Sequence, residues 1–187
     1  MPPSMQPMSK RPPVHHLELR VVEIAELFNS MDPTPFLHRD LDRDAERFLE
    51  SWALEFPQDS HFRIVVHVER MPPADPAPLV SEAIRNYFEY RATVTRRSLR
   101  TLLGEGRASL VIGLAVLGLC FLGADLLSGH ATGTLVQLSK EGLLIGGWVA
   151  MWRPMQIFLY EWWPIARKCR IYRNLAGSTV QVVPAKP

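Results

Sequence analysis

Two kinds of hydrophobic pattern follow one another in the first part of the chain. Apolar and charged residues alternate over Leu17–Val21 and again over Phe62–Val68, as in half-buried strands. Between them, apolar residues recur at helical spacing from Leu41 to Phe56, with charged residues on the opposite face and Asp40 as the expected N-cap. A strand, a helix and a strand in this order predict a βαβ unit over 17–69, with parallel strands.

The second half of the chain carries two long apolar stretches. Residues 108–127 contain a single charged residue, near their end, and at about 1.5 Å per residue they span roughly 30 Å, the thickness of a bilayer's hydrocarbon core. A second stretch, 135–153, contains Lys140 and Glu141, which we expect near the far surface of the membrane. Joined by the short loop 128–134, the two stretches predict a transmembrane hairpin.

The remaining segments connect and flank these parts. Prolines crowd the first 16 residues, which have too little apolar surface to offset the entropy of ordering. A short alternating stretch, Thr179–Val183, predicts a strand that could join the first two as a third. Besides the βαβ unit, the two spans and their loop, we therefore expect a disordered Pro-rich tail (1–16), a Pro-rich linker (70–78), a basic juxtamembrane helix (79–107), an interfacial aromatic segment (154–165) and a basic C-terminal segment with the short strand (166–187).

Composition sharpens this division. The first 107 residues hold 14 Lys+Arg and 16 Asp+Glu, whereas the last 80 hold 7 and 3, so the charge is −2 in one part and +4 in the other. The net charge of +2 is too small to indicate a nucleic-acid partner. Cys120 and Cys169 lack the spacing of a metal or redox motif and predict free thiols. The fold class predicted is an α+β membrane protein, with a small cytoplasmic βαβ-type domain and a two-helix transmembrane hairpin.

Basic residues flank the two predicted spans, and the loop between the spans has none. The positive-inside rule then places both termini and the βαβ unit in the cytoplasm. The same side chains could instead bind anionic lipid. They are Arg96, Arg97, Arg100 and Arg107 before the first span and Arg167, Lys168, Arg170 and Arg173 after the second.

Aromatic residues and an arginine gather after the second span, where tryptophan and tyrosine prefer the membrane–water interface. We predict membrane-interface anchors at Trp152, Arg153, Tyr160, Trp162 and Trp163. An arginine within the membrane would be functional, whereas one at the interface is an anchor, and we favour the anchor. Pairing with Glu161 or with a lipid phosphate would satisfy Arg153 in either case.

Gly142, Gly146 and Ala150 recur every four residues, a spacing that lets two membrane helices approach closely. Either they associate with a partner or a second copy, or they pack on the chain's own first span, which has glycines of its own. We favour packing within the chain.

Candidate chemistry is sparse. Asp40, Asp42 and Asp44 begin like a calcium loop, but the required glycine and glutamate are replaced by Ala45 and Ser51. The six histidines form no metal-binding motif, and no nucleophile elbow or phosphate loop is present. We therefore predict no metal, no cofactor and no catalytic set. If the chain has a reactive loop, its candidates are Asp32, His38 and Asp40.

Two blocks of the sequence carry a resemblance. They are LFNSMDPTPFLHRDLDRDAERF (27–48) and GWVAMWRPMQIFLYEWWP (147–164). They resemble a family of uncharacterised bacterial inner-membrane proteins with two spans, over about Leu17 to Val183. The resemblance implies a protein of the bacterial inner (cytoplasmic) membrane and carries over no activity, cofactor or site residue.

Three functions fit this organisation. The first, which we favour, is a non-catalytic accessory, assembly or regulatory subunit of a membrane complex, with membrane lipid and either a second copy or another membrane protein as partners. The second is a membrane-surface enzyme that acts on a lipid or small molecule. The third is a small oligomeric transporter lined by Lys140, Glu141 and Arg153.

Overall fold

The computed structural model describes residues 14–32, 39–130 and 133–185. The chain divides into two compact units. We call the first, Met1–Val94 with Arg167–Pro187, the sheet unit, and the second, Thr95–Ala166, the helical unit. The helical unit is thus inserted between two described segments of the sheet unit, one ending at Val94 and one beginning at Arg167.

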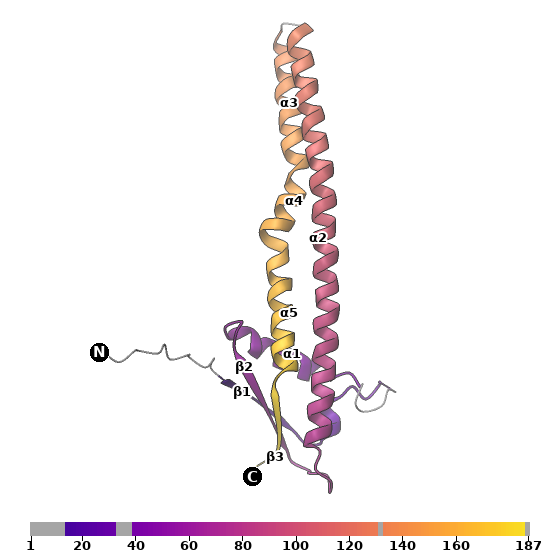
Figure 1. Ribbon diagram of the computed structural model, residues 1–187, viewed down its shortest axis with the longest axis vertical. Helices are drawn as coiled ribbons and strands as arrows, with labels where there is room; N and C mark the ends of the chain where they lie inside the picture. The colour runs from indigo at the N-terminus through magenta and orange to yellow at the C-terminus, as the bar shows by residue number, and fades with distance from the viewer. Residues whose placement is uncertain (1–13, 33–38, 131–132, 186–187) are drawn as a thin grey trace, which may run out of the picture. The chain divides into compact units, whose positions relative to one another are not determined.

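The sheet has three parallel strands in the order β1-β2-β3 (Figure 1). They are β1 (Val14–Val21), β2 (His61–Val68) and β3 (Thr179–Pro184). The α+β class with a parallel sheet is therefore confirmed, and the C-terminal strand joins the first two as a third.

Strand β1 begins at Val14, three residues earlier than the expected start at Leu17. Residues 14–16, which we assigned to the disordered tail, pair with His61–Arg63 of β2, and the rest of that tail lies outside the described residues. The ring of His15 also stacks on Phe56 at a centroid distance of 3.9 Å. A histidine gives no apolar signal in the sequence, so only the partner strand and the aromatic ring reveal this part of β1.

Helix α1 (Arg43–Glu55) crosses between β1 and β2, after the 3-10 turn η1 (Ile24–Leu27). Its N-cap is Asp42, whose side chain accepts a hydrogen bond from the Asp44 N–H at 2.8 Å, and not Asp40 as we expected. Asp40 is held in the preceding loop, because its N–H donates to Asp32 Oδ2 and its carbonyl accepts from Asn29 N–H. The choice between the two aspartates therefore depends on a contact made outside the helix.

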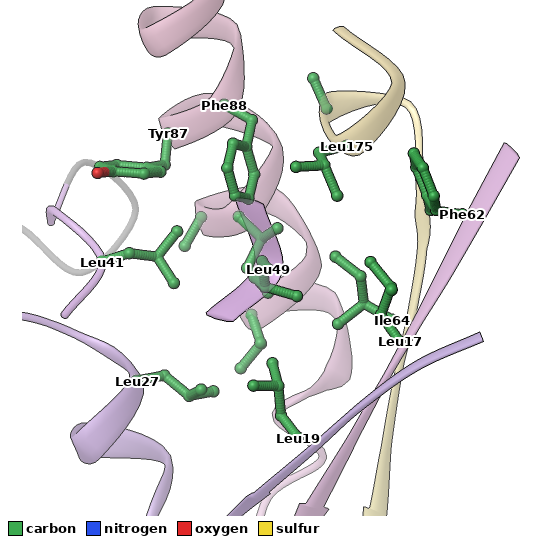
Figure 2. Packing of buried hydrophobic residues seen from close by; sticks show 14 of the residues in the cluster. Leu17, Leu19, Leu27, Leu41, Leu49, Phe62, Ile64, Tyr87, Phe88 and Leu175 are labelled. Carbon is green, nitrogen blue, oxygen red and sulfur yellow. The ribbon is translucent and has the colours of Figure 1, made fainter. Parts of the chain in front are cut away.

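The core of the sheet unit lies on one face of the sheet. Leu49 of α1, Phe88 of α2 (Ala77–His130) and Leu175 of α5 (Trp162–Ala176) point toward Leu17 and Ile64 of the sheet (Figure 2). All five are fully buried or nearly so. Alternate residues of each strand, among them Leu17, Ile64 and Val182, therefore face the helices, and the intervening residues face away from them.

Helix α2 is 54 residues long and contains the first predicted span. By length and composition it is the one helix of the described residues that is long and apolar enough to cross a membrane. A core helix of a soluble protein would pass the same test, but such a helix is mostly buried, whereas only 11% of the apolar window of α2 is buried. Residues 14–32, 39–130 and 133–185 thus contain a single candidate membrane-spanning helix by this measure.

The second predicted span, 135–153, is not one uniform helix. Helix α3 (Thr134–Ala150) has 17 residues and ends before Met151, and α4 (Trp152–Gln156) and the π-helical turn η3 (Ile157–Glu161) follow. The cause is Pro154, which has no N–H to donate to the carbonyl four residues earlier, at Ala150. The expected pair of continuous spans is therefore corrected to one long apolar helix and one interrupted series.

Within the helical unit, α2 and α3 run antiparallel and side by side (Figure 1). Gly123 lies near Leu143, Gly147 near Leu117 and Gly113 near Ala150. Residues later in α2 thus pack against residues earlier in α3, as in an antiparallel helix pair.

Candidate functional site

The interruption between α3 and α4 is held against a glycine of α2. A Cβ atom added to Gly113 would lie 2.9 Å from the carbonyl oxygen of Ala150 and 3.0 Å from Met151 Sδ. That carbonyl is the one left without its usual helical donor by Pro154. Gly113 therefore lets the backbone of α2 approach the interruption more closely than any larger residue would.

A second close approach lies beside the π-helical turn. A Cβ added to Gly106 would lie 2.8 Å from Ile157 Cγ2 and 3.1 Å from Phe158 Cζ. In the turn itself, the indole N–H of Trp162 donates to the Phe158 carbonyl at 2.8 Å. This bond satisfies a carbonyl of the π-helical turn, a rare geometry that is frequently found at functional sites.

Arg153 forms an ion pair with Glu161, at 2.6 Å between Nη1 and Oε1. This is one of the two partners that the sequence suggested. Eight residues separate them, and α4 and η3 bring them together. The charge of Arg153 is thus matched within the chain before any lipid contributes.

The aromatic residues around this pair are largely exposed. Trp152, Tyr160 and Trp163 are 69%, 71% and 66% exposed. Trp162 is half-buried, and its ring meets that of Trp163 edge to face at 5.8 Å. Three of the predicted interface anchors therefore present their rings outward, and their role as anchors stays a prediction.

The basic residues before the first span are exposed on α2. Arg96, Arg100 and Arg107 lie within an arc of about 40° on one face of that helix, over about 16 Å, at 100° and 1.5 Å per residue. Among the described residues, no carboxylate pairs with these three or with Arg97. They form an unneutralised stripe that remains available to an anion.

The basic residues after the second span lie differently. Arg167 donates to the Leu54 carbonyl at 2.6 Å, Lys168 pairs with Glu50 at 2.6 Å, and Arg170 lies 4.0 Å from Asp59. Arg173 is exposed. Three of these four side chains thus fasten α5 to the sheet unit, a role that the sequence analysis missed.

Lys168 belongs to a polar network between three helices, which we call the Arg91 network. Its members are Glu46 and Glu50 of α1, Arg91 of α2, and Lys168 and Tyr172 of α5. Arg91 lies 2.5 Å from Glu46 and 5.5 Å from the centre of the Tyr172 ring. The Tyr172 hydroxyl donates to Glu50 at 2.9 Å and accepts from Arg91 at 3.4 Å. The network ties all three helices together above the apolar core.

The network shifts the pKa values of its members. Burial alone would raise the pKa of Glu50, but hydrogen bonds from Lys168 and Tyr172 and the nearby positive charges outweigh burial and lower the pKa. Burial, together with the hydrogen bond to the Glu50 carboxylate, raises the pKa of Tyr172 to about 12. Burial works against the charge of Arg91, but Glu46 and Tyr172 outweigh it and raise its pKa. The shifts of Glu50 and Tyr172 favour an ionised carboxylate and a neutral hydroxyl, which are the protonation states that the hydrogen bond between α5 and α1 requires.

An open groove of about 600 Å³ lies beside the network, along α1. Its charged lining is paired within the chain, Asp44 with Arg47 at 2.8 Å and Glu50 with Lys168. Phe48, also in the lining, contacts Trp52 with ring centres 5.1 Å apart. The groove thus offers aromatic surface and no free charge.

Two of the three loop candidates come together. The Asp32 carboxylate accepts the Asp40 N–H at 2.8 Å. The third, His38, lies outside the described residues. The bond closes the loop before α1, which is a structural role, and a reactive role for these residues stays a prediction.

The predicted small-residue face is divided. A Cβ added to Gly142 or Gly146 would meet no described atom within 4 Å, whereas one added to Gly147 would lie 2.8 Å from Leu117 Cδ1. Packing on the chain's own first span, which we favoured for Gly142 and Gly146, is therefore made by Gly147 and by the Ala150 carbonyl. Association of the outward glycines with a partner stays a prediction.

On the face of the sheet away from the helices, the side chains of the described residues are exposed or partly exposed. The pairing of the strands places its side chains in three cross-strand rows: His16, Arg63 and Thr179; Glu18, Val65 and Gln181; and Arg20, His67 and Val183. Contacts within this face include Glu18 with His67 at 3.5 Å and Arg20 with Glu69 at 3.4 Å. Parallel sheets are almost always covered on both faces, so an open face is unusual.

Among residues 14–32, 39–130 and 133–185, no three His, Cys, Asp or Glu side chains are grouped so that they could hold a metal ion. Comparisons of the chain with protein-family models, with curated proteins and with solved structures found no match in any of the three.

Proposed function

We propose that this chain is a non-catalytic accessory, assembly or regulatory subunit of a complex in a bacterial inner membrane. The helical unit would be its membrane anchor, and the sheet unit a cytoplasmic interaction domain. The proposal rests on one observation above all, a three-stranded parallel sheet whose face away from the helices is left at least partly exposed by the described residues.

A parallel sheet of three strands is small. Its covered face holds the core, but the opposite face carries Val65 and Val183 among polar residues. Edge strands and open parallel faces are normally covered, because their unpaired backbone groups and apolar side chains favour association. A partner that covers this surface would complete the usual arrangement.

The connectivity supports two membrane crossings. The helical unit joins the sheet unit at both of its ends, after Val94 and before Arg167. A chain that leaves one side of a membrane and returns to the same domain must cross an even number of times. Since α2 is long enough for one crossing, the return falls to α3 and α4, which reach from Thr134 to Gln156 and at about 1.5 Å per residue extend roughly 34 Å.

The side chains support a common depth for both helices. Gly106 of α2 lies beside Ile157 and Phe158, so Arg107 and the exposed Tyr160 lie near the same level of the helical unit. Arginine and tyrosine at one level, next to apolar stretches, are typical of a membrane–water interface. The exposed stripe of Arg96, Arg100 and Arg107 would face anionic headgroups there and keep the sheet unit cytoplasmic.

Cysteine labelling tests the membrane arrangement. In a chain with Cys120 and Cys169 replaced by alanine, we expect Gly133→Cys to react with a membrane-impermeant maleimide in intact spheroplasts. Asp59→Cys, on the sheet unit, should react only after lysis. The reverse pattern, or equal labelling of both, would contradict the hairpin or its orientation.

The interaction function is tested by purifying the tagged chain from its native membrane in mild detergent and identifying the retained proteins by mass spectrometry. We expect a stoichiometric partner, which Val65→Glu on the open face should release. Tyr90→Glu is the matched control, because Tyr90 is 61% exposed on α2, away from the sheet. A wild-type chain that is monomeric and retains no other protein would refute the proposal. That result would favour the enzyme or the transporter alternative.

A further inference from the structure

We propose that the arginine stripe of α2 binds a membrane lipid whose head carries two phosphate groups, one at Arg107 and one between Arg96 and Arg100. The proposal deepens the proposed function, on which it rests for the membrane position of α2, because it names the class of lipid that the stripe binds. It requires that no described carboxylate neutralise the stripe, that an apolar surface continue the stripe into the membrane, and that the stripe extend beyond the layer of ordinary headgroups.

The stripe concentrates positive charge on one side of α2. Arg96 and Arg100 are four residues apart, so their side chains are neighbours on the helix surface, and like charges at this spacing repel each other. No carboxylate of the described residues forms an ion pair with either arginine. Glu105, the single acidic residue from 95 to 107, lies about 160° around the helix from Arg107. An anion between Arg96 and Arg100 would therefore relieve this repulsion.

An apolar surface continues the stripe beyond Arg107. At 100° per residue, Val111, Leu114 and Phe121 lie within about 40° of Arg107 on the same side of α2. Each of these three side chains is half exposed or more. A positive region followed by an exposed apolar surface on one side of a helix matches a molecule with an anionic head and an acyl tail. A soluble phosphate compound would contact only the positive region, so the stripe fits a lipid better.

The length of the stripe indicates the size of the head. Arg107 directly precedes the apolar run of 108–127. Arg100 and Arg96 lie about 10 Å and 16 Å farther from that run along the axis of α2, at 1.5 Å per residue. The polar layer on each side of a bilayer is only about 5–8 Å deep, and the usual helix tilt of about 20° shortens the axial distances only slightly. A head with one phosphate would therefore contact Arg107 and end short of Arg96, whereas a second phosphate farther out would reach Arg96 and Arg100.

The surface between the two phosphate positions is left unfilled at Gly104. This residue has no side chain, and a Cβ added to it would meet no described atom within 4 Å. It lies about 40° around the helix from Arg100 and about 60° from Arg107. Space is thus available beside the arginines for the linker that joins two phosphates. Arginine suits both positions, because its planar guanidinium donates two parallel hydrogen bonds to a phosphate.

Two lipids that differ by one phosphate test the ligand. Phosphatidylglycerol has one phosphate, and phosphatidylglycerophosphate carries a second at the far end of its glycerol headgroup. Each lipid, with matched acyl chains, is titrated into the full chain purified in mild detergent, and the bound lipid is measured by native mass spectrometry. We expect phosphatidylglycerophosphate to bind about tenfold more tightly, as one additional charge-assisted hydrogen bond would give. Equal affinities for the two lipids would overturn the proposed second phosphate.

Two exposed arginines of α2 provide matched variants. Arg100→Gln removes a charge at the second phosphate, so it should weaken the binding of phosphatidylglycerophosphate about tenfold, with little change for phosphatidylglycerol. Arg97→Gln makes the same change in net charge, but Arg97 lies about 60–100° around the helix from the three members of the stripe, so the preference should persist. Circular dichroism confirms that both variants are folded. No loss from Arg100→Gln, or the same loss from both variants, would overturn the assignment of the second phosphate to the stripe.

A soluble competitor separates a lipid from a free phosphate compound. Glycerol 3-phosphate carries the same kind of phosphate without acyl tails, so we expect that it does not displace phosphatidylglycerophosphate at equal concentration. Displacement at equal concentration would assign the arginines to a soluble compound and overturn the lipid proposal. The cysteine labelling and the partner retention described above test the proposed function separately. Equal affinities for the two lipids, with the expected labelling pattern, would refute the lipid site and leave the proposed function standing.

Discussion

Gly113 and Gly118 provide a matched pair of substitutions on one helix. A Cβ on Gly113 would lie 2.9 Å from the Ala150 carbonyl oxygen and 3.0 Å from Met151 Sδ, whereas a Cβ on Gly118 would meet no described atom within 4 Å. We expect Gly113→Ala to destabilise the packing of α2 against the α3–α4 interruption, and Gly118→Ala to have no such effect.

The magnitude follows from the nature of the close contacts. The Met151 sulfur is on a flexible side chain and can move, but the Ala150 oxygen is backbone and can move only with the helix. Overpacking of this kind costs about 1–3 kcal/mol. The gain in helix propensity, up to about 1 kcal/mol for alanine over glycine, applies to both variants and cancels in the difference between them. Gly113→Ala should therefore be about 1–3 kcal/mol less stable than Gly118→Ala.

Thermal unfolding in detergent measures this difference. For a chain of this size, 1 kcal/mol corresponds to about 2–4 °C in Tm, so we expect Gly113→Ala to melt at least about 2 °C below Gly118→Ala. Gly113→Leu should widen the gap. Equal melting temperatures for both alanine variants would refute the close approach of α2 to the interruption.

Three further predictions concern the interruption and the Arg91 network. Pro154→Ala restores an N–H opposite the Ala150 carbonyl, so hydrogen exchange followed by NMR should find the new amide protected; rapid exchange there would show that another constraint ends α3. Tyr172→Phe removes the hydrogen bond to Glu50 and should lower the free energy of unfolding by about 1 kcal/mol, a modest amount because Glu50 is partly exposed. Urea unfolding that monitors the sheet unit measures this change. An unchanged midpoint would show that the network does not hold α1 and α5 together. The pKa of Glu50 is lowered in the folded state, so the ionised carboxylate stabilises the fold above the ordinary pKa of 4.5, and this stabilisation is lost as the pH falls below 4.5. Glu50→Gln should make the free energy of unfolding less dependent on pH in this range. A wild-type chain whose stability does not fall on acidification would contradict the lowered pKa of Glu50.

The sequence by itself determined the elements whose signals are local. Alternation predicted strands at Leu17–Val21 and Phe62–Val68, and helical periodicity placed α1 within a few residues of its observed bounds. The apolar run of 108–127 predicted the helix that, in the part of the chain that the structure describes, is long and apolar enough to cross a membrane. Each of these depends on the properties of neighbouring side chains, which the sequence displays directly. Pro154 was equally local, and its effect on the Ala150 carbonyl could have been read from the sequence.

The tertiary structure decided which surfaces meet. Gly142, Gly146 and Gly147 are indistinguishable by residue type, and only the rotation of α3 against α2 selects Gly147 for the contact. Arg91 lies 81 residues from Tyr172 and 45 from Glu46, so no spacing along the chain indicated their network. The basic residues of α5 were expected to set the membrane topology or to bind anionic lipid, yet Lys168 pairs with Glu50 of α1. Charge and periodicity give each helix its faces, but the partner of a face depends on how distant segments pack, and that is settled only when the whole chain is folded.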